Sequence, residues 1–469
     1  MDLPQNKGVP MLKKRMIALF AVSALIVSGQ AAFMGASHAA PRTVTVWSPF
    51  SGDGLAIWDA AIARFEKTHP AINVVSVGSV DMAKSLAAIN AGTGPDISVA
   101  NGAGNVGWFC STGAWQNLNK NIASKTVGLD VKSIFPASVL SSTISVGNRC
   151  ALPFAAEVVG MYYNKDMLAK AGFTKPPTTV EELTAYSKKL TTFDSAGNIK
   201  TAGFVPWVGY NNPYGFGAQD LGFMFGAHWY SPNGAPAFGT DPLWAKAFNW
   251  QKTFITDVFG GGNFTLGKSR LLKFTAGAGD EWGGDSDFMT GKTAMWIVAQ
   301  WMAGAYCDNT GNWVLNPCNH PYINFGVAPT PVLAAMKSTN YGAGRFSAQP
   351  MGISKGSKNP TDAWEVLKFL ATDTKLQIDY SNWGTSIPAT KAALASKDLV
   401  YPAVYKTFFD IVAHPRSGYH PLMPTGEHLD EVELDDLMAG WQAGSVTNLS
   451  DALTSAGANV AKIIERQGK

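Results

Sequence analysis

The sequence predicts an α/β fold organised in two lobes, and three observations lead to this prediction. Strand-like and helix-like segments alternate over residues 44–99, the alternation resumes after Pro153, and no low-complexity linker separates the two stretches. The chain has 469 residues, of which 46% are hydrophobic, so it is long enough for two or three domains and can bury a large core. The same composition excludes a mostly disordered protein.

The N-terminal region is expected to run strand, helix, strand, helix, strand. Strand-like runs occupy residues 44–47, 72–77 and 96–99. After the first run, apolar residues spaced three and four apart mark one face of a helix, which Pro70 ends. These apolar residues are Leu55, Trp58, Ile62 and Phe65. A second helix is marked by Met82, Leu86 and Ile89. Such alternation is typical of a parallel, doubly wound sheet.

The alternation restarts in the second half of the chain. Residues 158–163 are strand-like, and residues 165–171 form a short helix that Gly172 closes. Thr178 and Glu181 have the spacing of a capping box, which opens the next helix.

The later segments are predicted less uniformly. Residues 203–240 are rich in glycine, proline, asparagine and aromatic residues, so we expect irregular structure there. Residues 289–305 look helical or mixed, and residues 324–328 look like a strand. One helix is expected to begin at the Asn-Pro pair of residues 359–360, and a last one at Ser450.

The first 39 residues are expected to be a secretory signal peptide. A basic start at residues 13–15 precedes an apolar run at residues 16–27, and small residues, Ser37 and Ala39, stand before a cleavage site near Ala39. The run is shorter than the roughly 20 residues that span a bilayer, and an uncleaved anchor helix is the alternative. The whole chain carries a net charge of +3 and the cleaved chain would carry none, which argues against nucleic-acid binding.

The four cysteines suggest two disulfides, because an exported protein enters an oxidising compartment. Three pairings are possible. Cys307 and Cys318 would close a short loop at the lowest entropic cost, which leaves Cys110 to pair with Cys150. Four buried free thiols are the alternative, whereas the spacing does not fit a zinc site, so no metal is expected.

Catalytic and cofactor motifs are weak. Gly102, Gly104 and Gly107 form G-x-G-x-x-G after a strand, but that strand is the third of its lobe and the next acidic residue, Asp130, is distant for a ribose contact. We therefore expect no cofactor, and these glycines also suit a backbone that approaches a small ligand closely. The acidic residues at 280–287 show no spacing that marks a glycosidase pair.

The aromatic residues are unusually numerous, with 15 Trp, 13 Tyr and 25 Phe. Trp207 and Tyr210 lie in the glycine-rich segment, and Trp282, Trp301 and Trp383 each stand beside glycine residues that interrupt regular structure. Flat rings suit the apolar faces of sugars, while polar side chains suit the hydroxyl edges. The sequence thus favours carbohydrate binding, although core packing is the alternative for each of these rings.

Several blocks in order resemble the extracellular solute-binding proteins of ABC importers, the sugar- and maltose-binding family. The resemblance covers nearly the whole mature chain and rests on six segments. They are residues 43–47 (TVTVW), 94–97 (GPDI), 152–157 (LPFAAE), 162–166 (YYNKD), 291–295 (GKTAM) through Trp301, and 353–360 (ISKGSKNP).

The resemblance implies a two-lobed periplasmic-binding-protein fold with a ligand cleft between the lobes. It makes Glu157 and Trp301 the best candidates for ligand contact. It also places further candidates in loops that face the ligand or near the return crossover, namely Ser51, Asp53, Asn101, Gly102, Gly344 and Arg345.

The expected division assigns residues 40–155 and 345–395 to the N-terminal lobe and residues 156–344 and 396–469 to the C-terminal lobe. The expected function is that of a periplasmic substrate-binding component of an ABC sugar importer. It would bind a mono- or oligosaccharide, pass it to the transmembrane subunits of a permease, act as a monomer and catalyse no reaction. The alternatives are a secreted carbohydrate-active enzyme, and the same fold binding a non-sugar such as a glycerol phosphodiester.

Overall fold

The computed structural model describes residues 41–210, 216–279, 284–307, 323–426 and 428–467, and the expected signal peptide lies outside these residues. A ten-stranded mixed sheet runs through them in the order β2-β1-β3-β11-β6-β9-β8-β7, with β10 and β12 also paired to β6. Its strands are β1 (Arg42–Trp47), β2 (Ile72–Val77), β3 (Ile97–Val99), β6 (Leu152–Asn164), β7 (Thr192–Phe193), β8 (Ile199–Phe204), β9 (Thr293–Ala299), β10 (Phe325–Ala328), β11 (Phe346–Ile353) and β12 (Ile387–Pro388). A separate hairpin joins β4 (Ile144–Ser145) and β5 (Asn148–Arg149).

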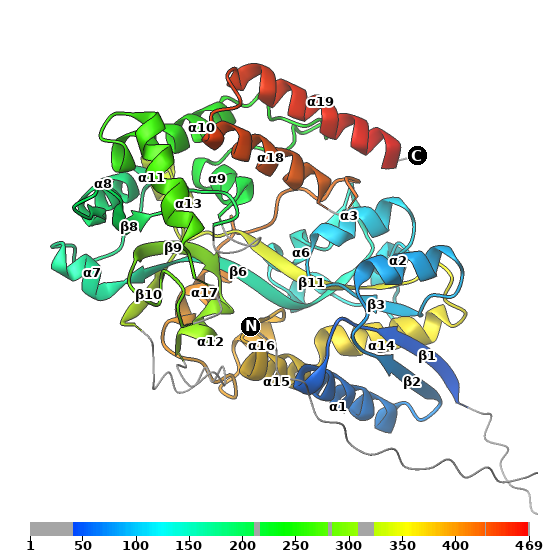
Figure 1. Ribbon diagram of the computed structural model, residues 1–469. Helices are drawn as coiled ribbons and strands as arrows, with labels where there is room; N and C mark the ends of the chain where they lie inside the picture. Colours follow the sequence, from blue (N-terminus) through cyan, green and yellow to red (C-terminus); the bar gives the residue numbers. More distant parts are fainter. Residues whose placement is uncertain (1–40, 211–215, 280–283, 308–322, 427, 468–469) are drawn as a thin grey trace, which may run out of the picture. The chain divides into compact units, whose positions relative to one another are not determined.

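Helices cover both ends of this sheet (Figure 1). Toward the N-terminal strands they include α1 (Gly52–Thr68), α2 (Met82–Asn90), α3 (Gly104–Ser111), α6 (Ala137–Ser141), α14 (Pro360–Thr372), α15 (Thr374–Gly384) and α16 (Lys391–Leu394). α17 (Tyr405–Ala413) lies against β6 and β10. Toward the other end they include α7 (Lys165–Lys170), α8 (Val180–Leu190), α9 (Ala218–Phe225), α10 (Pro242–Phe254), α11 (Phe264–Ala276), α12 (Met302–Cys307), α13 (Lys337–Asn340), α18 (Leu429–Ala443) and α19 (Leu449–Gln467).

The N-terminal strands pair as predicted. β1 lies between β2 and β3 and runs parallel to both, with α1 and α2 as the crossovers that parallel pairing requires. Trp58, Ile62 and Phe65 of α1 are buried, because the face that the sequence marks as apolar packs against the sheet. The predicted strand-helix alternation is confirmed here.

Two long strands join the two halves of the molecule. β6 and β11 are antiparallel neighbours at the centre of the sheet, and β11 also pairs with β3. The side chain of Val158 belongs to the hydrophobic core that contains β1 and α14, whereas that of Val159 belongs to a second core formed by α8, α9 and α10. Farther along β6, Met161 belongs to the second core and Tyr162 again to the first, so β6 supplies side chains to both cores.

Some elements differ from the sequence expectation. Residues 203–240 are not wholly irregular, since they contain α9, and residues 289–305 divide into β9 and the start of α12. All seven residues of β9 are buried, so its sequence shows no alternation that would reveal a strand. The α/β fold class is confirmed, while the exact lobe boundaries stay a prediction.

One disulfide joins Cys110 at the end of α3 to Cys150 just before β6, with a Cα–Cα separation of 5.7 Å, as predicted. Cys307 is also disulfide-bonded, but its expected partner, Cys318, lies outside the described residues. None of the helices in the described part of the chain has the length and apolar character needed to cross a bilayer.

Candidate functional site

Glu157 lies on β6, the strand that supplies side chains to both cores. Ser347 of β11 is directly opposite it, and Gln349 lies on the same face of β11, because side chains two apart in a strand point the same way. The Gln349 Nε2 group donates a hydrogen bond of 3.1 Å to Glu157 Oε1. We call Glu157, Ser347 and Gln349 the polar floor.

The environment of Glu157 disfavours its charged form. Burial raises the pKa of Glu157 to about 7, while the hydrogen bond from Gln349 and the positive charge of Arg345 act in the opposite direction. A carboxylate held in this way is a costly group for the folded protein, which points to a role other than stability.

An aromatic surface adjoins the polar floor on the side of the first core. Tyr380 of α15 is hydrogen-bonded to Gln349, and the negative charge of Glu157 helps to raise the pKa of Tyr380. Its ring centroid is 5.5 Å from that of Trp383, a large side chain that is 44% exposed. An exposed tryptophan beside a buried carboxylate combines an apolar face with hydrogen-bonding groups.

Two predicted loops border this area. The ring of Trp383 packs against the first turn of α1, since a Cβ atom placed on Gly54 would be 2.7 Å from this ring. The exposed residues Ser51 and Asp53 stand at the same end of α1. The Ala103 backbone N–H, one residue beyond Asn101 and Gly102, donates to Ser347 Oγ (2.9 Å). The loop of Asn101 and Gly102 therefore adjoins the polar floor, Ser51 and Asp53 lie near Trp383, and ligand contact by these four residues stays a prediction.

Trp301 reaches the same area from the second core. The preceding residue, Gln300, accepts a 2.6 Å hydrogen bond from the Val158 backbone N–H through its side-chain oxygen, so it is tied to the neighbour of Glu157. Trp301 is half-buried and packs against both cores. The two residues that the sequence ranks highest, Glu157 and Trp301, are thus brought near each other.

Arg345 lies near the polar floor, two residues before Ser347. It immediately precedes β11, and its Nε donates to Asp220 Oδ1 (2.9 Å) and its Nη1 to Gln219 Oε1 (2.6 Å). Burial lowers the pKa of Arg345, but Asp220, Tyr419 and Glu431 together raise it, so the net shift of the pKa is upward. These contacts give Arg345 a structural function at the start of α9, and its predicted ligand contact stays a prediction.

Other predicted residues lie away from the polar floor. The Tyr210 hydroxyl donates to Asp287 Oδ2 (2.6 Å) beside Thr293, at the opposite end of β9 from Trp301. Trp207 packs against the second core. Gly344 is buried, because a Cβ there would be 2.5 Å from the side chain of Ile411. Trp282 lies outside the described residues. Sequence reasoning missed Gln349 and Tyr380, which carry no local signal.

The described part of the chain has two cavities, and the larger one is lined in part by Arg345 and Gln219. The larger, of about 460 Å³, opens between α9 and residues 415–421.

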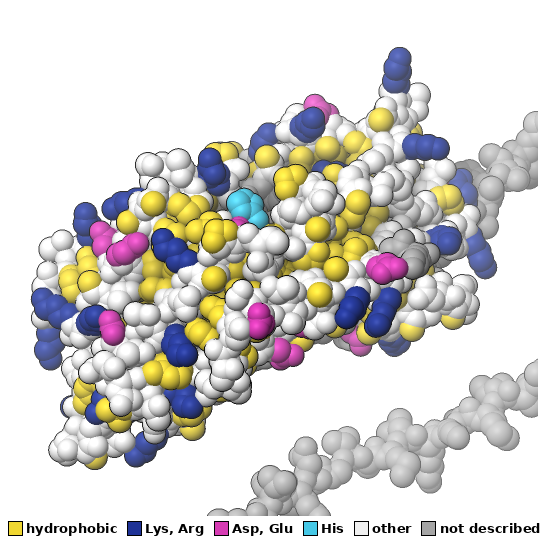
Figure 2. Space-filling model, turned by 90° about the horizontal axis from the view of Figure 1, so that it is seen from above, with side chains coloured by type: hydrophobic (Ala, Val, Ile, Leu, Met, Phe, Trp, Pro, Cys, Tyr) yellow, Lys and Arg dark blue, Asp and Glu magenta, His cyan; other side chains and the backbone are white. Residues whose placement is uncertain are grey.

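On the face shown in Figure 2, acidic and basic side chains are interspersed among hydrophobic ones and do not gather into a patch of one sign.

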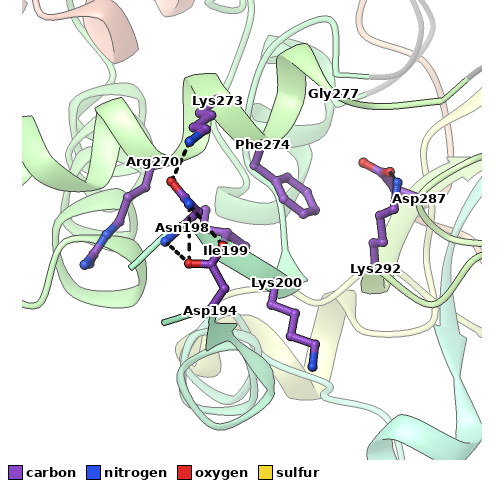
Figure 3. Close-up of a pocket in the computed structure, with 10 residues that line it drawn as sticks. All are labelled: Asp194, Asn198, Ile199, Lys200, Arg270, Lys273, Phe274, Gly277, Asp287 and Lys292. Carbon is purple, nitrogen blue, oxygen red and sulfur yellow. Dashed lines mark hydrogen bonds and ion pairs between the residues drawn. The ribbon is translucent and has the colours of Figure 1, made fainter. Parts of the chain in front are cut away.

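The second cavity, of about 330 Å³, is basic and lies by β8 and α11. Figure 3 shows Lys292 extended toward Asp287 and Lys273 toward Asn198. The Lys273 Nζ donates to Asn198 Oδ1 (2.9 Å), and Lys292 lies 3.4 Å from Asp287. Because these groups pair with one another, the polar floor is the better candidate site.

Known relatives agree with this architecture. Residues 51–403 match the family model described as "Bacterial extracellular solute-binding protein". A galactooligosaccharide-binding protein of Bacillus subtilis (strain 168) is 25% identical over 401 residues, 82% of this chain and 83% of that protein. A binding protein of Brucella abortus (strain 2308) is 26% identical over 323 residues, and the match covers 65% of this chain and 66% of that relative, just under two thirds.

Solved structures share the fold. The sugar-binding protein MalE of Xanthomonas citri aligns with a TM-score of 0.69 and 17% identity over 91% of this chain and 98% of that one. CpMnBP1 with mannotriose bound aligns with a TM-score of 0.66 and 24% identity over 89% of this chain and all of that one. With its family model matched across residues 51–403, the chain belongs to the bacterial extracellular solute-binding proteins.

Proposed function

We propose that this protein captures an oligosaccharide in a cleft between its two lobes and delivers it to the permease of an ABC importer. The observation that carries the proposal is the exposed ring of Trp383 beside the carboxylate of Glu157, joined through Tyr380 and Gln349. Sugars present apolar ring faces and hydroxyl edges, so a ring surface next to hydrogen-bond acceptors suits them. Several relatives bear the names of oligosaccharide-binding proteins, which supports this ligand class.

The site residues come from both sides of the crossover strands. Ser51, Asp53 and Trp383 stand on the side of the first core. Asn101 and Gly102 lie between residues of a third, smaller core, and Trp301 packs against the first and the second. A ligand that touches both sides at once stabilises the closed arrangement of the lobes, because it binds that state more tightly than the open one. We propose that the protein acts as a monomer in the periplasm.

The alternatives fit the geometry less well. A phosphodiester ligand requires cationic side chains in the site, and Arg345 already pairs with Asp220 and Gln219. A glycosidase requires a second carboxylate that faces the same bond as the first. The groups that act on Glu157 are instead an amide and a guanidinium, so we propose binding without catalysis.

A thermal-shift screen tests the proposal. Maltotriose, mannotriose and galactooligosaccharides are tested together with monosaccharides, glucuronic acid and glycerol phosphodiesters. A true ligand present at 100 times its Kd should stabilise the native state by about 2.7 kcal/mol and raise the Tm accordingly. If only the phosphodiesters raise the Tm, or if no sugar does, the proposed function is wrong.

Variants locate the site. Glu157→Gln and Trp383→Ala should each weaken binding of the best oligosaccharide by about 1–3 kcal/mol in calorimetric titration. Trp250→Phe is the matched control, because Trp250 lies on α10 and bonds to Thr184, remote from the polar floor. Equal affinity of all three variants and the wild type would remove the polar floor from the binding site.

A further inference from the structure

We propose that Gln349 is a positioning residue for Glu157, which holds the carboxylate ready to accept hydrogen bonds from sugar hydroxyls and sets the pH range in which the site binds. This inference rests on the proposed function and extends it to residues that have no role in it so far. It follows from the hydrogen bonds around one buried amide.

The amide group of Gln349 donates to Glu157 while its own oxygen is left without a hydrogen bond from the described part of the chain. Gln349 is 6% exposed, and its Nε2 donates to Glu157 Oε1 and is hydrogen-bonded to the Tyr380 hydroxyl. Its own carbonyl oxygen, Oε1, is buried and accepts no hydrogen bond from any described residue. A buried acceptor without a donor costs free energy, so this amide orientation is maintained because the NH2 group is needed where it is.

The carboxylate, in turn, keeps one oxygen for a ligand. Gln349 occupies Oε1, and no described residue donates to Oε2. Glu157 retains partial solvent contact, so Oε2 is not sealed in the core. The carboxylate is therefore fixed at one oxygen and open at the other, which is the arrangement required to receive a hydroxyl donor in a defined direction.

Few charged groups face Glu157. Among the described residues, Arg345 just before β11 contributes a positive charge, and Tyr380 on α15 contributes a neutral hydroxyl. Arg345 is itself paired with Asp220, so its field at Glu157 is partly compensated. The donor from Gln349 is then the nearest specific support for the charged form.

Protonation would reverse the arrangement. A protonated Glu157 could donate its proton to Gln349 Oε1 once the amide turns by 180°, and the amide oxygen would then have a donor. The O–H group of the acid would then donate to the amide oxygen of Gln349, and the carboxyl group would offer a sugar fewer hydrogen-bond acceptors. Sugar affinity should consequently fall as Glu157 becomes protonated.

The test is the affinity of the best oligosaccharide from the screen, measured by calorimetry from pH 5 to pH 9. Gln349→Met keeps the volume but removes the donor, so it should weaken binding about tenfold at pH 7. Most of this loss should disappear at pH 9, because the midpoint of the affinity profile moves upward by about one pH unit. Tyr380→Phe, which keeps the ring against Trp383, should cause a smaller upward shift.

Two controls separate positioning from structure. Ser347→Ala removes the bond to the Ala103 backbone on the same face of β11 and should leave the midpoint in place. In a Glu157→Gln background the profile should be flat, and Gln349→Met should not introduce a pH dependence.

The outcomes are distinct. If the wild type binds sugar and Gln349→Met lowers the affinity equally at every pH, or lowers the Tm without moving the midpoint, the positioning role is refuted while the proposed function stands. If no oligosaccharide binds the wild type, the proposed function fails before this inference is reached.

Discussion

Arg345 and Asp220 form an ion pair, and replacing either residue alone should destabilise the folded protein. Their side chains are 23% and 2% exposed, and Nε lies 2.9 Å from Oδ1. Removing one partner of a buried pair leaves the other charge uncompensated, so Arg345→Met should lower the free energy of unfolding by about 3–5 kcal/mol. Arg345→Met combined with Asp220→Asn should recover much of that loss in urea denaturation. An equal loss in both variants would mean that packing, and not charge, is what Arg345 provides.

Glu157 should act on stability in the opposite sense from a paired carboxylate. Burial raises its pKa to about 7, so between its ordinary value and pH 7 the folded state holds a proton that the unfolded state has released. The contribution of Glu157 to stability is therefore greatest at acidic pH and is lost as the pH rises through 7.

Replacement by glutamine removes this titration. Glu157→Gln should match the wild type in Tm near pH 4.5 and exceed it at pH 8, and the difference between the two Tm values is the measured quantity. Other raised carboxyls, such as Asp435 with a pKa of about 6, are present in both proteins and cancel in that difference. A variant that is less stable at pH 8 would indicate that Glu157 has a stabilising partner.

The residues of the site differ in how far the sequence could predict them. Glu157 follows an apolar run within a motif, so its type and place are visible locally. Gln349 has no such signal, because it meets Glu157 only when strands 192 residues apart pair, and Tyr380 comes from α15, farther along the chain. Arg345 was predicted as a ligand contact, but its partner Asp220 lies 125 residues away, and no local pattern shows that pairing.

At the scale of elements, α3 packs closely against the segment just before α18, and glycines of α3 permit this close packing. A Cβ on Gly107 would be 2.2 Å from the backbone oxygen of Met423, whereas a Cβ on Gly104 would meet the ring of His428, a side chain that can turn away. The close approach predicted for these glycines is thus made by the chain itself.

The two substitutions should differ accordingly. Gly107→Ala should destabilise the protein by about 1–3 kcal/mol, because backbone atoms must move apart. Gly104→Ala should cost less, since only a ring moves and alanine favours the helix. Gly356→Ala, with open space around the position, is the control. Chemical denaturation ranks the three, and an equal cost for Gly104→Ala and Gly107→Ala would contradict this account of the contact.

Elements with a one-sided apolar face were predictable, and those set by distant contacts were not. The spacing in α1 and the turn at Pro70 are local, so the first three strands and their helices were predicted correctly. α9 was missed because its first turn is fixed from afar: the Ala218 backbone N–H donates to Asp435 Oδ1 (2.7 Å). The pairing of Cys110 with Cys150 was reached from cost and elimination, and it is correct.

At the scale of the whole molecule, the two cores are joined by strands that belong to one sheet. β6 contributes residues to both cores, and β11 runs beside it from β3 to the start of the second core. A hinge made of strands permits rotation of packed halves with little change inside either. The aromatic surface of Trp383 lies on the side of the first core and Trp301 packs against both cores, so closure around a ligand would cover both rings.

Closure should therefore be visible in tryptophan emission. Trp383 is 44% exposed without ligand, so acrylamide should quench it readily, and a saturating oligosaccharide should shift the emission to shorter wavelength and reduce the quenching. Trp383→Phe should lose most of this change, whereas Trp250→Phe should keep it, because the control ring packs on the far side of the second core. The radius of gyration measured by X-ray scattering should fall in the same titration, since covering Trp383 from the opposite side requires the halves to approach. A sugar that raises the Tm and protects Trp383 but leaves the radius of gyration unchanged would mean that the ligand binds to one half alone.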